Sequence, residues 1–151
     1  MADAKKAATW LAICVGCVAS FEGLRTVAYL DPVGIPTVCF GETAGVRLGD
    51  KYTAEECRAL LGTRVAEFGE AVDRCVTVPL PPTRKAALGS FAYNVGERAF
   101  CESTLVKKLN SGDTVGACDQ LLRWTKARGI EWPGLVKRRQ QERQLCLEGL
   151  A

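Results

Sequence analysis

The sequence predicts an α+β fold that is mostly helical, as one domain in which a long helix joins a small lobe to a helical lobe. Two short β-prone runs flank the Asp-Pro-Val-Gly turn at residues 31–34, which is typical of a hairpin. A long amphipathic helical pattern follows, and shorter helical patterns fill the remainder. We expect the small lobe at about 13–55, the connecting helix at about 54–75 and the helical lobe at about 76–151.

The segment from Ala7 to Phe21 is nearly uncharged and follows two lysines. It is similar to a short signal-like segment, but it is shorter than the roughly 20 residues that a membrane span needs. It also lacks a clear cleavage site before Glu22. We therefore predict a buried core helix here. Weak membrane association through this segment remains an alternative.

The predicted strands at residues 26–30 and 35–40 contain or adjoin Pro32 and Pro36, which is typical of edge strands. Thr53 and Glu56 have the spacing of a capping box, and this box opens the strongest predicted helix, which ends near Cys75. Its apolar side chains fall on one face: Cys57, Leu60, Leu61, Val65, Phe68 and Val72.

Prolines then interrupt the helical pattern, and further helices are predicted at residues 84–95 and 103–110 and after the cap Asp113. The helix after Asp113 should turn four side chains inward: Val115, Cys118, Leu121 and Leu122. Residues 124–132 read as an irregular connector. Its two tryptophans, if exposed, could stack on sugars; the alternative is that they pack in the core, as most tryptophans do. Pro133 opens the last helix, whose apolar anchors are Leu135, Leu145, Cys146 and Leu150.

The composition excludes several classes of function. The chain has no histidine, so Ser-His-Asp catalysis, Cys-His catalysis and His-ligated zinc hydrolysis are unavailable. Its net charge of +3 is too small to indicate nucleic-acid binding. Carboxylate chemistry remains possible, and no metal site is expected, because the cysteines do not form paired ligand clusters.

Eight cysteines in a chain of 151 residues indicate disulfides and an oxidising compartment, although a reduced protein with buried thiols is the alternative. Cys57 and Cys75 would stand about 27 Å apart on one helix, which is too far to bridge. The positions of the remaining cysteines favour three bridges: Cys39–Cys57, Cys75–Cys101 and Cys118–Cys146. Cys14 and Cys17 would remain as thiols one helical turn apart.

Glu22, Asp31 and Thr37 form a compact polar group in an otherwise apolar setting. Two carboxylates suit glycoside hydrolysis, in which one donates a proton and the other handles water or the developing charge. The apolar residues before Glu22 would favour its protonated form, whereas Asp31 on a turn should stay ionised. The alternative is that Glu22 ends a helix, Asp31 starts a turn and Thr37 is an ordinary strand residue.

Tyr93 and Asn94 lie off the apolar stripe of their predicted helix, near its C-terminal end. An aromatic ring can cover a pyranose face, and an amide can bind an acetamido group. The alternative is a half-buried tyrosine and an asparagine that ends the helix beside Gly96.

At these residues the sequence resembles the tailed-phage lysozymes, or endolysins. The resemblance rests on Glu22, Asp31 and Thr37 at their spacing and on further motifs over about residues 13–148. These motifs are Val-Cys-Phe-Gly-Glu-Thr from Val38, Ala-Leu-Gly-Ser-Phe-Ala-Tyr-Asn-Val-Gly from Ala87, Ser-Thr-Leu from Ser103, Leu-Asn-Ser-Gly-Asp from Leu109 and Leu-Val-Lys-Arg-Arg-Gln-Gln-Glu-Arg from Leu135. Many relatives read Gly-His-Thr where this chain has Glu42 between Gly41 and Thr43.

The resemblance implies a lysozyme-like fold with Glu22 as the acid and with Asp31 and Thr37 placing a water. It places Tyr93 and Asn94 at the cleft, and it brings Arg138 and Arg139 near Glu22. The implied activity is that of an endolysin: a muramidase that cuts the β-1,4 bond between N-acetylmuramic acid and N-acetylglucosamine, without cofactor or metal. Because Asp31 and Thr37 would both hold a water, we predict an inverting mechanism.

The expected partner is bacterial peptidoglycan, and the expected protein is a monomer. It would be made in the host cytoplasm and act in the periplasm on the cell wall. Two alternatives are a lytic transglycosylase, which needs an acid but no water, and a non-catalytic cell-wall-binding module.

Overall fold

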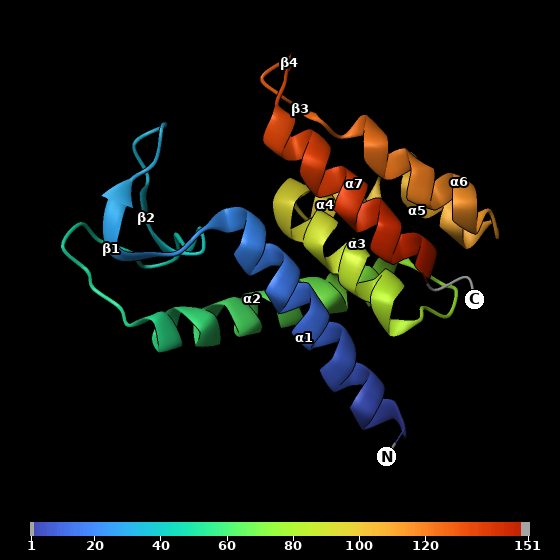
Figure 1. Cartoon of the computed structure of the whole chain (residues 1–151), viewed down its shortest axis with the longest axis horizontal. Helices are drawn as coiled ribbons and strands as arrows, with labels where there is room; N and C mark the ends of the chain where they lie inside the picture. The colour runs from blue at the N-terminus through green and yellow to red at the C-terminus, as the bar shows by residue number, and fades with distance from the viewer. Residues whose placement is uncertain (1, 149–151) are drawn as a thin grey trace.

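The computed structural model describes residues 2–148, with side chains from Thr9 onward, and it has the predicted α+β fold in which helices dominate. A β-hairpin and the first half of a long helix form one end of the molecule, and a cluster of helices forms the other end (Figure 1). The elements in chain order are α1 (Ala2–Glu22), β1 (Arg25–Leu30), β2 (Pro36–Cys39), α2 (Ala54–Cys75), α3 (Pro82–Val95), α4 (Glu97–Cys101), α5 (Thr104–Asn110), α6 (Thr114–Gln120), the 3₁₀ turn η1 (Leu121–Arg123), β3 (Lys126–Ala127), β4 (Ile130–Glu131) and α7 (Pro133–Glu148).

Strands β1 and β2 pair antiparallel, with Tyr29 opposite Thr37. Asp31 closes the turn, because its Oδ1 accepts backbone N–H bonds from Val33 at 2.9 Å and from Ile35 at 2.8 Å. The outer edges of this two-stranded sheet are only partly paired, by single antiparallel bridges from Val27 to Lys51 and from Val38 to Glu42, and proline is tolerated in such edge strands. The predicted hairpin is therefore confirmed.

Helix α2 begins at the predicted capping box. The Thr53 hydroxyl accepts the Glu56 N–H, and the Glu56 carboxylate accepts the Thr53 N–H, both at 3.0 Å. The apolar face of the helix is divided between two hydrophobic clusters. Cys57, Leu61 and Val65 pack with the hairpin and α1, whereas Val72 packs into the helical body. The helix therefore connects two separate cores.

Helix α1 buries one face, on which Trp10, Cys14 and Val18 recur every four residues. The ring of Trp10 packs so closely on α2 that a Cβ at Gly69 would lie 2.2 Å from it, so only glycine fits there. The prediction of a helix that packs into the core is confirmed, with one face of the helix buried. Within residues 2–148, no helix combines the length and the apolar character that crossing a membrane requires.

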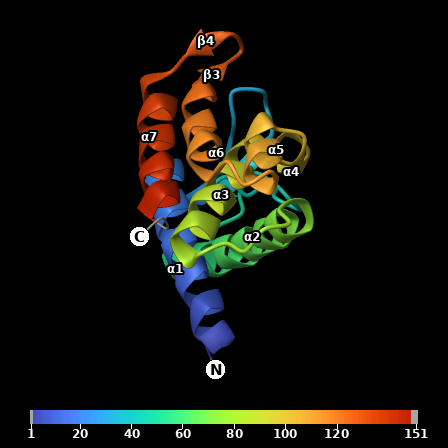
Figure 2. The same cartoon turned by 90° about the vertical axis from the view of Figure 1, so that its right-hand side faces the viewer.

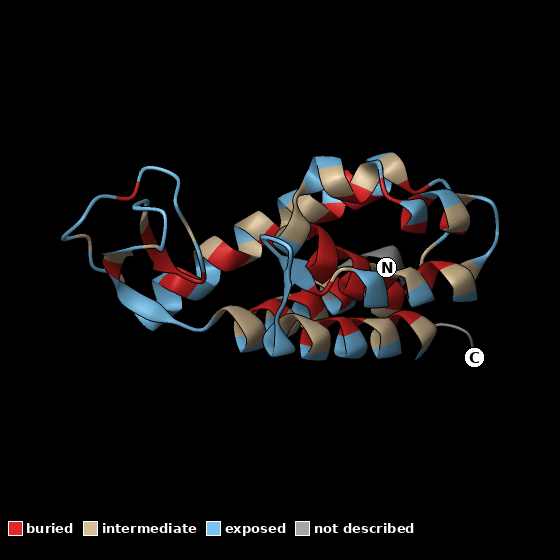
Figure 3. Ribbon diagram, turned by 90° about the horizontal axis from the view of Figure 1, so that it is seen from above, coloured by how far each residue is buried: buried red, intermediate tan, exposed pale blue. Residues whose placement is uncertain are grey.

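Helix α3 is the centre of the helical body, and α1, α2 and α7 pack around it (Figures 1 and 2). Buried residues concentrate where these helices face one another (Figure 3). The ring of Phe91 contacts Phe100 and Trp124, with centroids 6.1 and 5.2 Å away. Of the two alternatives for the tryptophans of the connector, packing in the core holds for Trp124, because its ring covers Phe91.

Two predictions are wrong in the region of α6. Val115 and Leu122 were expected to point inward, but they are 51% and 42% exposed. Helix α6 buries only the face that carries Ala117 and Cys118, against α5 and α7. The chain then continues as the 3₁₀ turn η1. Because a 3₁₀ turn has three residues per turn, the directions of successive side chains differ from those in an α-helix. Leu121 is buried there, whereas Leu122 is exposed.

The predicted connector at residues 124–132 contains the small hairpin β3–β4, and α4 is a further element that periodicity did not predict. Both are too short to show a helical or strand period in the sequence. Of the predicted anchors of the last helix, Leu150 lies outside the described residues.

The three predicted disulfides are confirmed: Cys39–Cys57, Cys75–Cys101 and Cys118–Cys146. Each joins two elements that lie far apart in the sequence: β2 to α2, α2 to α4, and α6 to α7. Cys14 is a buried free thiol and Cys17 a half-buried one.

Candidate active site

Glu22 is the last residue of α1, where the chain turns through Gly23, with a φ of 72°, into the hairpin. Its side chain is 25% exposed. Its Oε1 accepts a hydrogen bond of 2.7 Å from Nη1 of Arg138 on α7. Of the two arginines expected near Glu22, Arg138 therefore makes the contact.

Two cavities meet at Glu22. One has a volume of about 450 Å³ and lies between the loop after β2 and helices α2 and α3. The other has a volume of about 600 Å³ and lies between the end of α1 and the start of α7. Glu22 and Asn94 line both. Volumes of this size accommodate small-molecule or sugar-sized ligands, so the carboxylate lies in the shared wall of two ligand-sized cavities.

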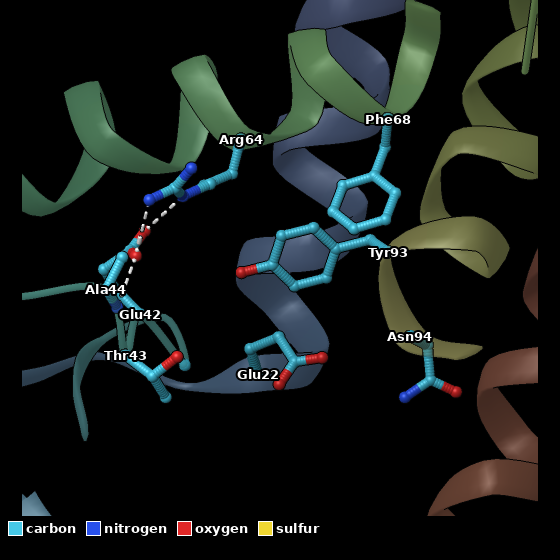
Figure 4. Close-up of a pocket in the computed structure, with 9 residues that line it drawn as sticks. Glu22, Glu42, Thr43, Ala44, Arg64, Phe68, Tyr93 and Asn94 are labelled. Carbon is cyan, nitrogen blue, oxygen red and sulfur yellow. Dashed lines mark hydrogen bonds and ion pairs between the residues drawn. The ribbon is translucent and has the colours of Figure 1, made fainter. Parts of the chain in front are cut away.

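The first cavity is lined by Glu22, Gly41, Glu42, Thr43, Ala44, Arg64, Phe68, Tyr93 and Asn94 (Figure 4). The second is lined by Ser20, Phe21, Glu22, Asn94, Trp132, Gly134, Leu135, Lys137, Arg138 and Gln141. Neither set includes Asp31 or Thr37.

Asp31 and Thr37 lie in the hairpin. The Oδ1 of Asp31 is occupied by its own turn, whereas its Oδ2 makes no hydrogen bond within the described part of the chain. Thr37 is 4% exposed, and its hydroxyl donates to the Ile35 carbonyl at 2.9 Å. The threonine oxygen can therefore still accept a hydrogen bond from a bound water. Glu22, Tyr93 and Asn94 therefore line one cavity, whereas Asp31 and Thr37 are not among the residues that line it.

Tyr93 spans the cavity between α3 and the hairpin. Its ring lies edge-on to Phe68, with centroids 5.4 Å apart, and its hydroxyl donates to the Phe40 carbonyl at 2.7 Å. Burial, together with the negative charges of Glu22 and Glu42, raises the pKa of Tyr93 to about 12. Its hydroxyl therefore stays protonated and remains a donor. Figure 4 shows the Tyr93 ring between Phe68 and Glu22.

Asn94 is oriented by an arginine. Its Oδ1 accepts a hydrogen bond from Nη2 of Arg139, which leaves the Nδ2 protons directed to the cleft (Figure 4). The Nε of Arg139 donates to the Trp124 carbonyl at 2.9 Å. An amide held in this way offers a fixed donor to a carbonyl group of a ligand.

Glu42 and Arg64 form the wall opposite Glu22, and sequence patterns missed Arg64. Two guanidinium nitrogens of Arg64, Nε and Nη2, donate to the two Glu42 oxygens at 2.8 and 3.0 Å. These bonds hold the pKa of Glu42 below its ordinary value although burial opposes them. Arg64 lies one helical turn from Phe68 in α2, and this spacing was the available signal.

Trp132 forms the edge of the second cavity and is 52% exposed. Its indole N–H donates to the Ala127 carbonyl at 3.3 Å, which restrains the ring. Lys137 and Gln141, one turn apart on α7, line the same cavity. Of the two tryptophans in the connector, Trp132 is therefore in a position to stack on a sugar.

Within the described residues, no group of three or more metal-ligating side chains could hold a metal ion. The groups that line the two cavities include carboxylates, an amide, aromatic rings and the cations of Arg64, Lys137 and Arg138.

Residues 19–142 match the family model for phage lysozyme. The chain is 46% identical over 129 residues to the SAR-endolysin of Enterobacteria phage PA-2, a match that covers 85% of this chain and 78% of that protein. It is also similar to the solved muramidase domain of SpmX from Asticaccaulis excentricus, with a TM-score of 0.84, 34% identity and coverage of 89% and 94%. The endolysin from Escherichia coli O157:H7 phage FAHEc1 gives a TM-score of 0.83 at 33% identity, with coverage of 90% and 91%. The lysozyme-like fold expected from the sequence is thereby confirmed, and the chain belongs to the phage lysozyme family.

Proposed function

We propose that this protein is an endolysin with muramidase activity, which hydrolyses the β-1,4 bond between N-acetylmuramic acid and N-acetylglucosamine in peptidoglycan. Relatives over most of the chain are endolysins, and one structural neighbour is a muramidase domain. The observation that carries the proposal is the position of Glu22, a three-quarters buried carboxylate where two cavities meet. A polymer bound across both cavities has its linkage at that carboxylate.

In this mechanism Glu22 donates a proton to the leaving oxygen, while Asp31 and Thr37 hold the attacking water. The uncommitted Oδ2 of Asp31 and the acceptor capacity of the Thr37 oxygen support these roles. The mechanism is inverting, because a threonine contact to water has no purpose if Asp31 attacks the sugar directly. An inverting pair needs about 6.5–9.5 Å between its carboxyl groups.

Tyr93, Asn94 and Trp132 bind the substrate. The Asn94 amide donates to an acetamido carbonyl, and the exposed face of Tyr93 covers a sugar ring. Trp132 stacks on a sugar on the other side of Glu22. Arg138 counters the charge that Glu22 acquires when it has lost its proton.

The two hydrophobic clusters joined by α2 support a division into two lobes, at about 13–55 and 76–151, with the cleft between them.

The protein acts as a monomer in the periplasm after synthesis in the host cytoplasm. Three disulfides support action in an oxidising compartment.

Weak membrane association involves the outward face of α1, where a shallow apolar hollow is lined by Leu11, Ala12, Val15, Gly16, Ala19 and Arg58. Recovery of the full chain in the inner-membrane fraction, resistant to salt but released by detergent, supports this association; recovery wholly without detergent contradicts it.

Mass analysis of sugars released from purified peptidoglycan tests the function. We expect reducing muramic acid ends from the wild type and none from Glu22→Gln, which keeps the shape of the side chain and removes the proton donor. General acids commonly contribute about 10²–10⁴-fold. Ends with a 1,6-anhydro ring would indicate a transglycosylase, and binding to the wall without release of sugars would indicate a non-catalytic module.

A further inference from the structure

Glu142 on α7 is a carboxylate with no exposure to solvent. Burying a charged carboxylate is costly unless it is paired and hydrogen-bonded. Glu142 meets this condition on both oxygens. Oε1 accepts from Nη1 of Arg139, while Oε2 accepts from the Ser90 hydroxyl at 2.6 Å and from Nε of Arg138 at 3.3 Å.

The guanidinium group of each arginine also contacts a residue that lines the cavities, and this residue differs between the two arginines. Nη1 of Arg138 donates to Glu22 at 2.7 Å, and its Nη2 donates to the Ser90 carbonyl at 3.1 Å. Nη2 of Arg139 donates to Asn94. A guanidinium is a rigid planar fork, so the orientation of its inner edge determines the direction of its outer edge.

We propose that Glu142 is a positioning residue for the whole cleft: through Arg138 it positions Glu22, and through Arg139 it positions Asn94. This inference rests on the proposed function, in which Glu22 is the acid and Asn94 binds substrate. Glu142 itself touches no cavity of the cleft and acts only through the two arginines.

The charge of Glu142 matters as well as its shape. Arg138 and Arg139 are 4% and 1% exposed, so their positive charges are poorly screened. Glu142 and Glu22 together balance them. Without Glu142, Glu22 alone faces both cations, and this favours the ionised carboxylate over the proton-donating acid.

Few other titratable groups act on this cluster. From α1, Cys14 and Cys17 face it; burial raises the pKa of both thiols, that of Cys14 to about 12, and the charge of Glu142 adds to the increase. From α3, Tyr93 lies near Glu22, and burial raises its pKa to about 12. The two thiols and the Tyr93 hydroxyl stay neutral below pH 8, so changes of rate in that range do not arise from them. Glu42 lies opposite Glu22 in the first cavity, and the hydrogen bonds from Arg64 hold the pKa of Glu42 below its ordinary value. Lys137 lines the second cavity together with Glu22.

Glu142→Gln tests the inference, with Glu148→Gln on the exposed end of α7 as the control. Initial rates on solubilised peptidoglycan are measured from pH 4 to pH 9. We expect the alkaline limb of the Glu142→Gln profile to move to lower pH, with a loss of about tenfold at neutral pH for a shift of one unit. KM should also rise, because Asn94 is no longer held. Glu148→Gln should match the wild type.

A double-mutant cycle with Asn94→Ala separates positioning from simple destabilisation. If Glu142 acts on Asn94 through Arg139, the two effects on KM are less than additive. An unshifted pH profile with additive effects would overturn the inference and leave Glu142 a structural residue.

If Glu142→Gln does not fold by circular dichroism, Ser90→Ala replaces it, since it removes a hydrogen bond to Glu142 without leaving an unpaired charge. Because Ser90→Ala keeps the charge of Glu142 and only loosens its position, the pH profile should stay in place while KM rises, since Arg139 and Asn94 are held less firmly; an unchanged KM overturns the inference.

These outcomes are distinct from failure of the proposed function. If Glu22→Gln remains active, the assignment of the acid is wrong and the question of Glu142 loses its basis. If Glu22→Gln is inactive while Glu142→Gln keeps the wild-type pH profile and KM, the role of Glu142 alone is rejected.

Discussion

The hydroxyl of Tyr93 donates a 2.7 Å hydrogen bond to the main-chain carbonyl of Phe40, across 53 residues of sequence. The donor lies on α3 in the helical body, and the acceptor follows β2 in the hairpin. This bond therefore ties the two ends of the molecule together at the cavity that Tyr93 and Glu22 line.

Tyr93→Phe should separate the effect of this hydrogen bond on stability from the effect of the ring on sugar binding. The variant keeps the ring and loses the hydroxyl, so stability should fall by about 0.5–1.5 kcal/mol, the usual net value of one hydrogen bond. KM should change little if the ring face is what meets the substrate. Tyr93→Leu removes the ring and should raise KM as well. Equal values of KM for the two variants would contradict a role for the ring in binding.

The close contact between α1 and α2 yields a matched pair of glycine variants. Gly69→Ala places a methyl group 2.2 Å from Trp10, so α1 must shift, at a cost of about 1–3 kcal/mol for such overpacking. Gly62→Ala in the same helix meets nothing within 4 Å and should stabilise by about 0.5–1 kcal/mol. Urea unfolding measures both. Destabilisation by Gly62→Ala would show that the effect belongs to α2 and not to the docking of α1.

The disulfide between Cys118 and Cys146 closes a loop of 28 residues. The loss of such a cross-link lowers stability by about 3–4 kcal/mol in the chain-entropy account. We expect this loss from the double variant Cys118→Ala and Cys146→Ala, together with a smaller term for the vacated space. Cys17→Ala, at a free and half-buried thiol, is the control. Thiol titration of unfolded, oxidised wild type should find only Cys14 and Cys17.

The ion pair of Glu42 with Arg64 should make stability depend on pH. The hydrogen bonds from Arg64 lower the folded-state pKa of Glu42 from its ordinary 4.5, so the pair stabilises the fold above that pH and the stabilisation disappears as the pH falls through the lowered value. Glu42→Gln should be less stable than the wild type at pH 7, and the difference should shrink below about pH 4.5. Glu67→Gln, which removes the exposed partner of Arg64, should show a weak dependence at most. A difference independent of pH would contradict the electrostatic origin.

The inverting mechanism predicts the configuration of the first product. Because the bond cut is β, the new reducing end should appear as the α-anomer, and proton NMR in the first minutes of digestion detects it before mutarotation. Thr37→Val, which removes the hydroxyl at nearly constant volume, and Asp31→Asn should both reduce turnover without unfolding the protein. A β-anomer that appears first would identify retention and would make Asp31 a nucleophile.

The sequence by itself determined the local elements and several of their connections. The capping box of Thr53, the turn at Asp31 and the long apolar face of α2 depend on residues a few positions apart, and such interactions are readable in one dimension. The disulfide pairings were also accessible, because the rigid length of a helix excludes Cys57 from pairing with Cys75.

The tertiary structure alone decided which side chains meet across the chain. Arg138 and Arg139 are adjacent and chemically identical, yet only Arg138 contacts Glu22, because the rotation of α7 about its axis directs neighbouring side chains about 100° apart. The burial of Glu142 and the partial burial of Trp124 depend on the same packing and have no signature in the local sequence pattern. It is also the packing of the hairpin that leaves Asp31 and Thr37 outside the walls of the two cavities that Glu22 lines. Local periodicity specifies which face of an element is apolar, whereas contacts between elements depend on how several such faces pack together.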